Sequence, residues 1–380
     1  MKLFEFEAKN ILKQYGIVIP QGKIASKPAE AQAAAQAIGK PAVVKSQILV
    51  SGRGKAGGIV FVSNGTEARD TAAKLLGSNV KGCVVERLLV EERLDIAAQF
   101  YASLAIDRQT KTYIALASTS GGVDIEEVAQ TSPEKIARSQ IDVTAGFSKK
   151  DATEMLSRFN LDKGDISALA EALSTLYTVA IDYDAELVEL NPLVKTLSGR
   201  FAAADARIIV DDNAVFRHPE LAARNSLAVE DTPREIEAKN QKLAYLDLDG
   251  DIGIVGNGAG LVMATIDMVR LAGGKPGNFL DLGGGGQAEK TKLGIMLVMS
   301  KPEIKAVLVN ILGGITRCDL VAEAIVQALN ESTTKKPLAI RMSGTNEDEA
   351  AHILRQAGIN SYRSMDEAVK NVVKLGGQLV

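Results

Sequence analysis

Residues 43–58 read VVKSQILVSGRGKAGG, and this stretch sets the fold of the first part of the chain apart from common phosphate-binding folds. Lys45 ends a short apolar run, and a glycine-rich turn that contains Arg53 follows it. Glycines let a backbone approach a phosphate closely, and basic side chains neutralise its charge. The P-loop pattern is absent, because Ala56 follows Lys55 where a Ser or Thr would stand. The stretch therefore indicates either a phosphate-binding loop of another kind or a solvated basic turn.

The composition is that of an ordinary globular protein of two or three domains. The 380 residues are 46% hydrophobic and 24% charged, with a net charge of −3, which argues against a nucleic-acid-binding surface. Cys83 and Cys318 fit no zinc spacing and suggest a reducing compartment. No apolar run approaches the roughly 18 residues of a transmembrane helix, and the first residues do not read as a signal peptide. We therefore expect a cytoplasmic protein with no membrane or nucleic-acid partner.

The first part of the chain mixes helices and strands. Periodicity predicts helices at 4–15, 29–38 and 150–180, and strands at 42–47, 59–62, 82–90, 95–106 and 112–118. The stretch EDTPREIEAKNQ, residues 230–241, is polar and charged. We place the boundary between two domains there.

A hairpin is predicted at residues 186–210, with its turn at Ser198–Gly199. Glu189 and Asn191 lie two residues apart and therefore share one face of a strand. A three- or five-residue turn would place Asn191 opposite Asp205, whereas a four-residue turn would shift the register by one. The first register would gather three oxygen-bearing side chains suited to Mg²⁺. The alternative is an ordinary polar face of an antiparallel pair.

From residue 251 onward, short apolar runs alternate with helical stretches. The helices are predicted at 259–272, 287–299, 316–330, 346–357 and 365–375. Five such units predict a doubly wound parallel sheet, whose ligands bind at the carboxyl ends of the strands. Those ends are glycine-rich here, at 256–260, 283–286, 313–314 and 344.

Two of these glycine turns suggest chemistry. The turn VGNGAG at 255–260 partly matches a dinucleotide fingerprint, and Asp281 falls where a ribose-binding acid would stand, so an NAD-dependent oxidoreductase is a remote alternative. A helix that begins at about Ile315 would favour an anion at its start. The two histidines, His218 and His352, neighbour no glycine turn, and we expect neither to be catalytic.

Taken together, these runs resemble the β subunits of succinyl-CoA synthetases (succinate–CoA ligases, ADP-forming) along nearly the whole chain. The matching runs keep their order and spacing, and they include FEFEAKNILKQYGI, VVKSQILVSGRGKAGG, ELNPLV, DIGIVGNGAGLVMATIDMV and AVLVNILGGITRCDL. The resemblance implies an α/β fold with an α+β part. An ATP-grasp domain would span 1–232, with a small nucleotide-binding lobe at about 20–92, and a flavodoxin-like domain would span 240–380.

The resemblance also implies roles for individual residues. Glu189 matches the carboxylate that positions a phosphohistidine, and Asn191 and Asp205 match the Mg²⁺ ligands. Three positions depart from the family: Gln99 replaces a nucleotide-contacting Glu, Leu49 replaces a His, and Thr316 stands where bacterial members often have Val. The nucleotide-binding positions are Lys45, Gly52, Arg53, Gly54, Glu91, Leu94 and Gln99, and the positions on the acid side are Asn257, Gly314, Ile315 and Thr316.

The implied reaction joins succinate to CoA at the expense of ATP and releases ADP and phosphate. The phosphate would pass through a histidine of a separate α subunit, which would also hold the CoA site, in an αβ or α2β2 assembly. Mg²⁺ would accompany the nucleotide. GTP in place of ATP, and malate or citrate in place of succinate, stay open alternatives. The flavodoxin-like domain of the family binds no nucleotide, which counts against an oxidoreductase.

Overall fold

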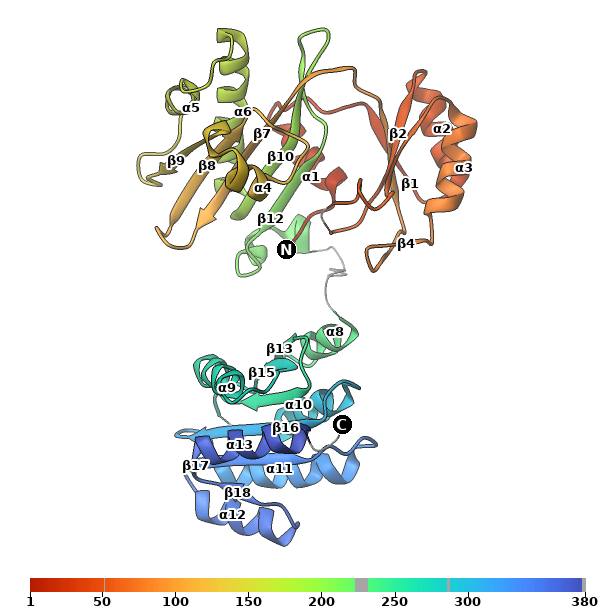
Figure 1. Cartoon of the computed structure of the whole chain (residues 1–380). Helices are drawn as coiled ribbons and strands as arrows, with labels where there is room; N and C mark the ends of the chain where they lie inside the picture. The colour runs from red at the N-terminus through yellow and green to blue at the C-terminus, as the bar shows by residue number, and fades with distance from the viewer. Residues whose placement is uncertain (51, 223–231, 286–287, 378–380) are drawn as a thin grey trace. The chain divides into compact units, whose positions relative to one another are not determined.

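The computed structural model describes residues 1–50, 52–222, 232–285 and 288–377, and the chain divides into two compact units, Met1–Glu230 and Asp231–Val380 (Figure 1). Residues 230–231 of the predicted boundary segment lie outside the described residues. Most of the rest forms helix α8 (Pro233–Asn240), which the polar composition did not predict. Thr232 and Glu235 form a capping box at its start, because each side chain accepts a hydrogen bond from the other residue's backbone N–H.

A four-stranded antiparallel sheet in the first unit carries the glycine-rich stretch at 52–58. Two helices cover one of its faces and pack through alanines such as Ala34 and Ala68 (Figure 1). Val44 and Val90 face these helices, so their neighbours Lys45 and Glu91 face the other side of the sheet. The strands in spatial order are β1 (Gly22–Ala25), β6 (Leu88–Glu92), β2 (Ala42–Ser46) and β3 (Ile59–Val62), and the helices are α2 (Pro28–Ile38) and α3 (Gly65–Leu75).

A second, six-stranded antiparallel sheet forms the rest of the first unit. Helices α5 (Lys149–Leu156) and α6 (Lys163–Asp182) cover one face, where Leu104 and Val188 belong to the main apolar core. Helix α1 (Glu5–Gln14) packs against strand β12 (Ala206–Val210). The strands are β11 (Phe201–Ala203), β10 (Ala185–Thr196), β7 (Ile96–Asp107), β8 (Thr112–Ser118) and β9 (Ile136–Ile141) in spatial order, and β12 (Ala206–Val210) also pairs with β10.

Several elements of this unit differ from the sequence prediction. The helical stretch predicted at 150–180 is two helices, and the strand predicted at 82–90 divides between a small hairpin and β6. The helices and strands that were not predicted include β1, α3, β9, α4 (Ile125–Thr131), α7 (Pro219–Ala222), and the 3₁₀ turns Pro133–Lys135 and Val215–Arg217. The small hairpin consists of β4 (Asn79–Val80) and β5 (Cys83–Val84).

The register of the β10 hairpin is the one that the sequence allowed for an oxygen cluster. Leu193 pairs with Ala203, and the backbone N–H of Asn191 donates to the carbonyl of Asp205 at 3.3 Å. The predicted pairing of Asn191 with Asp205 is therefore confirmed.

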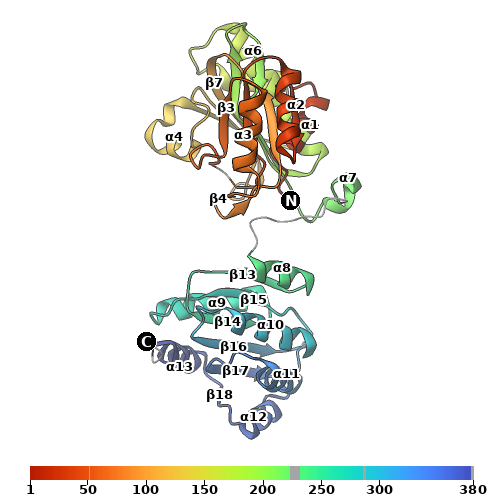
Figure 2. The same cartoon turned by 90° about the vertical axis from the view of Figure 1, so that its right-hand side faces the viewer.

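The second unit is a doubly wound sheet in which five strands run parallel. Helices α9 (Ala259–Leu271) and α13 (Met365–Gly377) cover one face, and α10 (Ala288–Ser300) and α11 (Cys318–Glu331) cover the other (Figure 2). Helix α12 (Glu347–Gln356) packs beside α11. The spatial order is β13 (Ala244–Asp247), β15 (Asn278–Asp281), β14 (Ile252–Gly256), β16 (Ala306–Gly313), β17 (Leu338–Gly344) and β18 (Ser361–Tyr362).

The five parallel strands follow the order second, first, third, fourth, fifth, which confirms the predicted flavodoxin-like fold. Strand β13 adds an antiparallel edge that the sequence did not predict. Helix α11 begins at Cys318, three residues later than the predicted start at Ile315. None of the helices in the described ranges is both long and apolar enough to span a membrane.

Candidate functional site

Six charged side chains meet between the two sheets of the first unit, and we call them the ion network. Helix α1 contributes two of them, strands β2 and β6 one each, and the glycine-rich stretch and the β10 hairpin the others. The members are Glu5, Lys9, Lys45, Arg53, Glu91 and Asp205.

Lys45 lies on β2 with only 7% of its surface exposed. Its Nζ lies 2.7 Å from Oε1 of Glu5 and 2.9 Å from Oε2 of Glu91, and it donates to the carbonyl of Ala204 at 2.6 Å. Burial alone would lower the pKa of Lys45, but the nearby carboxylates of Glu5, Glu91 and Asp205 outweigh this effect and raise the pKa. The side chain is therefore a fixed positive charge.

Arg53 holds the glycine-rich stretch against the rest of the network. One guanidinium nitrogen lies 2.9 Å from Oε2 of Glu5 and 2.8 Å from Oδ2 of Asp205, and the other donates to the carbonyl of Ser46. Gly52, with a φ of +75°, adopts the left-handed conformation that favours glycine, and both Gly52 and Gly54 are exposed. The structure thus places two cations beside an exposed glycine-rich loop.

Two further nucleotide-binding candidates lie on or just after β6. The carboxylate of Glu91 is buried between Lys9, at 2.7 Å, and Lys45, so in this structure it contacts two lysines. Leu94 lies in the connection to β7 and lines a hollow of about 290 Å³ beside the β10–β11 turn. The other residues that line this hollow are Lys40, Glu92, Arg93, Asp95, Thr196, Leu197, Ser198 and Arg200.

The metal-ligand candidates present oxygens at opposing positions of the hairpin. Oδ1 of Asn191 accepts from the backbone N–H of Gly122 at 2.8 Å, and the Asp205 side chain, 33% exposed, contacts Arg53. Amide and carboxylate oxygens are the donors that Mg²⁺ prefers, so these residues fit such an ion. Within the described ranges, no three or more His, Cys, Asp or Glu side chains group as metal ligands. Gln99 on β7 lies close to Gly122, the residue that donates to Asn191: a Cβ atom added to Gly122 would lie 2.5 Å from Oε1 of Gln99.

Glu189 lies on the face of β10 opposite the apolar core. The hydroxyl of Tyr101, itself 2% exposed, donates to Oε2 of Glu189 at 3.0 Å. Burial raises the pKa of Glu189, and the Tyr101 hydroxyl opposes this effect. The structure therefore places a partly buried carboxylate on the same strand face as Asn191.

The candidates of the second unit gather at the carboxyl edge of its parallel sheet. The side-chain amide of Asn257 donates to the carbonyl of Leu312 at 2.9 Å, and its oxygen accepts from the Leu312 N–H at 2.9 Å. The same amide nitrogen lies 3.4 Å from the hydroxyl of Thr316. Ile315 is 91% exposed, next to Gly314. The sequence thus correctly grouped the turn after β14 with the turn after β16.

Asp281, at the position where a dinucleotide-binding site would need an acid, accepts hydrogen bonds from the backbone. Oδ1 of Asp281 accepts from the N–H groups of Gly258, at 2.5 Å, and Gly283, at 2.7 Å. It therefore ties two glycine turns together, and this geometry disfavours the oxidoreductase alternative.

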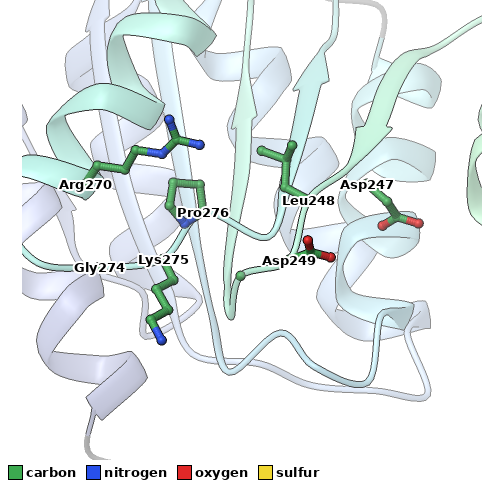
Figure 3. Close-up of a pocket in the computed structure, with 8 residues that line it drawn as sticks. Asp247, Leu248, Asp249, Arg270, Gly274, Lys275 and Pro276 are labelled. Atoms are coloured by element: carbon green, nitrogen blue, oxygen red, sulfur yellow. The ribbon is translucent and has the colours of Figure 1, made fainter. Parts of the chain in front are cut away.

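A separate hollow of about 370 Å³ lies at the amino-terminal ends of β14 and β15, away from these turns (Figure 3). The side chain of Lys275 points away from the guanidinium of Arg270 (Figure 3). Asp247 at its rim lies 3.1 Å from Lys301 and 3.2 Å from Arg234. No predicted site residue lines this hollow, and its charges do not converge.

Both histidines have local partners that fit a structural role. Nε2 of His218 lies 2.8 Å from the carboxylate of Asp184, and the ring stacks on Tyr183. His352 is exposed on α12 beside Gln356.

Sequence reasoning missed Glu5 and Lys9. They stand one helical turn apart in α1, a spacing typical of an exposed ion pair, yet both are buried. The available signal was that they share a helical face with Ala8 and Leu12, which belong to the apolar core.

Comparisons with known proteins cover both units. A match to the ATP-grasp domain family spans residues 2–195, and a match to the CoA-ligase family spans 255–375. The chain is 46% identical to the GDP-forming succinate–CoA ligase subunit beta of Thermus thermophilus, and 46% identical to the ADP-forming subunit of Desulfurococcus amylolyticus. Each match covers 99% of both chains.

A solved structure shares the fold at low sequence identity. ATP citrate lyase from Methanothrix soehngenii, in complex with citrate and coenzyme A, superposes with a TM-score of 0.69 at 19% identity. The match covers 98% of this chain and 99% of that one. At this identity the likeness concerns the fold alone.

Proposed function

The chain belongs to the family of succinate–CoA ligase β subunits, and from this premise we propose that it binds a nucleoside triphosphate in its first unit and an organic acid in its second. With an α subunit, it joins succinate to CoA while ATP is cleaved to ADP and phosphate. The phosphate passes through a histidine of the α subunit. The two subunits assemble as αβ or α2β2.

The convergence of Lys45 and Arg53 at a glycine-rich loop carries this proposal. Both cations are held by carboxylates that an incoming phosphate would replace in part. Fixed cations stabilise the charge of a transferring phosphoryl group without reorganising during the reaction. Gly52 and Gly54 offer backbone N–H groups at the same place. Asn191 and Asp205 would hold Mg²⁺, which neutralises phosphate oxygens when it is bound.

The remaining site residues divide between the two units. Glu189 positions the histidine of the α subunit, and its partly buried carboxylate is held by Tyr101. Asn257 and the turn at 314–316 bind the organic acid. The turn has exposed backbone, and beside it the side-chain amide of Asn257 contacts the Leu312 carbonyl and the Thr316 hydroxyl. We assign residues 1–232, with a small lobe at about 20–92, to nucleotide binding and residues 240–380 to the acid and the partner.

The choice of nucleotide and acid is the finer part of the proposal. The relatives of this chain include both ADP-forming and GDP-forming ligases, so the nucleotide can differ between members. The residues that would discriminate between ATP and GTP are the nucleotide-side candidates Glu91, Leu94 and Gln99. Thr316 would distinguish succinate from malate or citrate through its hydroxyl. We favour ATP and succinate.

The test is co-expression with an α subunit, followed by an assay for CoA-ester formation with succinate, malate and citrate, each with ATP and with GTP. We expect succinyl-CoA formation that requires Mg²⁺. Asn257→Ala should raise the KM for the acid and leave the KM for the nucleotide unchanged. Failure to form any CoA ester with any acid would refute the proposal.

A further inference from the structure

Lys9 is the most completely buried cation of the ion network, and the proposed reaction assigns it no role. Only 1% of its surface is exposed. Its Nζ lies 2.8 Å from Oε1 and 2.7 Å from Oε2 of Glu91, 2.8 Å from Oε1 of Glu5 and 2.8 Å from the carbonyl of Ala204. Burial of an ammonium group costs free energy unless the group is paired. Here the two carboxylates and the carbonyl pair the ammonium group of Lys9.

Lys9 and Lys45 share the same two carboxylates. Glu5 contacts both lysines with Oε1, and Glu91 contacts both with Oε2. Burial alone would raise the pKa of Glu5, but the surrounding cations hold the pKa well below its usual range, so the carboxylate is ionised. Each lysine therefore neutralises part of the carboxylate charge that would otherwise act on the other lysine.

The charge balance decides what is left for a phosphate. Apart from Asp205, which we assign to the metal, the network contains three cations and two carboxylates. One positive charge is in excess. Without Lys9, the two carboxylates would fully neutralise Lys45 and Arg53, and the site would offer a phosphate no net charge.

From this geometry we infer that Lys9 is a positioning residue of the nucleotide site, which neutralises Glu5 and Glu91 from the side of helix α1 and so keeps Lys45 and Arg53 available to phosphate. The inference rests on the proposed function, because it takes these two cations as the phosphate ligands. Lys9 acts through the two carboxylates and does not need to touch the nucleotide.

Four variants of the full 380-residue chain test the inference. The probe is the Mg²⁺ complex of a non-hydrolysable ATP analogue, and calorimetry measures its Kd. Lys9→Met should raise Kd by about tenfold, which is the effect of one unit charge roughly 12 Å away at an effective dielectric constant of about 20. Glu5→Gln should bind at least as tightly as the wild type. The double variant Glu5→Gln/Lys9→Met restores the charge balance and should bind within a few fold of the wild type. Lys13→Met removes an exposed charge from the same helix and should change nothing.

If the contacts of Lys9 served only to stabilise the fold, the four variants would rank differently in their affinity for the probe. The double variant would then bind no better than Lys9→Met, and that result would overturn the inference, as would unchanged affinity in Lys9→Met. If Lys9→Met does not fold, Glu5→Gln and the double variant decide: equal affinity of these two would also overturn it, and a tenfold weaker double variant supports it. A wild-type chain that does not bind the probe would refute the proposed function itself, before any substitution is compared.

Discussion

Replacement of Asp205 by Asn should change nucleotide affinity in opposite directions with and without Mg²⁺. Its backbone pairs with that of Asn191 across the hairpin, and its carboxylate lies 2.8 Å from the guanidinium of Arg53. In the presence of Mg²⁺ the variant loses an anionic ligand of the ion. In its absence, the variant loses a negative charge that competes with the phosphates for Arg53.

The two effects differ in size. Loss of one carboxylate ligand should weaken binding of the Mg²⁺ complex by at least roughly tenfold, because loss of a group that only supports a metal ligand already costs roughly tenfold to a hundredfold. Removal of one charge several ångströms from a phosphate is worth about 2 kcal/mol at an effective dielectric constant of about 20. Because a third of the Asp205 side chain is exposed to solvent, screening reduces this to about 1 kcal/mol, or roughly fivefold tighter binding of free ATP.

Calorimetric titrations with ATP, in excess Mg²⁺ and in EDTA, measure both constants. Asp212→Asn, an exposed acid after β12, is the matched control and should leave both unchanged. An equal loss of affinity in the two conditions would show that Asp205 supports the fold of the loop and does not bind the metal.

Three further predictions concern other parts of the chain. Glu189→Gln should leave nucleotide affinity intact but slow phosphorylation of the α subunit at least tenfold, as measured by rapid quench with labelled ATP; a normal rate would remove Glu189 from the mechanism. The chain alone should acquire no acid-labile phosphate from labelled ATP, and a label lost in His218→Ala would contradict the two-subunit reaction. Burial acts to raise the pKa of Asp247, but hydrogen bonds from Thr232, Tyr245, Arg234 and Lys301 outweigh it and lower the pKa to about 2. Asp247→Asn should therefore cost roughly 2 kcal/mol of unfolding free energy above pH 4, and the difference should vanish as the pH falls toward 2, whereas Asp249→Asn should have little effect in the same denaturant titrations.

Local patterns predicted much of the fold. The second unit follows its alternating pattern closely, because four of its five parallel strands, β14, β15, β16 and β17, are short apolar runs that end at or next to a glycine turn. The register of the β10 hairpin was predictable once the turn length was assumed, since side chains alternate along a strand. Helix α8 was missed although Thr232 and Glu235 have the spacing of a capping box, because its composition is polar.

The composition of the ion network was not predictable from local patterns. Lys45 and Arg53 stand out through the glycines around them, but Glu5 and Lys9 become buried only when α1 packs between the two sheets. Such burial depends on contacts distant in sequence, and no local periodicity encodes it. The start of α11 was misplaced because of contacts with the chain after β17: the Thr345 N–H donates to the Gly313 carbonyl, and the Cys318 N–H donates to the Thr345 carbonyl where the helix begins.

The ion network also constrains when the site can form during synthesis of the protein. Lys9 and Lys45 both donate to the carbonyl of Ala204, which lies 195 and 159 residues later in the chain. At ribosomal rates of about 5–20 residues per second, Ala204 is made roughly ten to thirty seconds after Lys45. The lobe that contains Lys45 can fold earlier around its own apolar core, yet its cations meet their last acceptor only when the hairpin emerges. A nascent or prematurely terminated chain would therefore present a folded lobe without a competent nucleotide site.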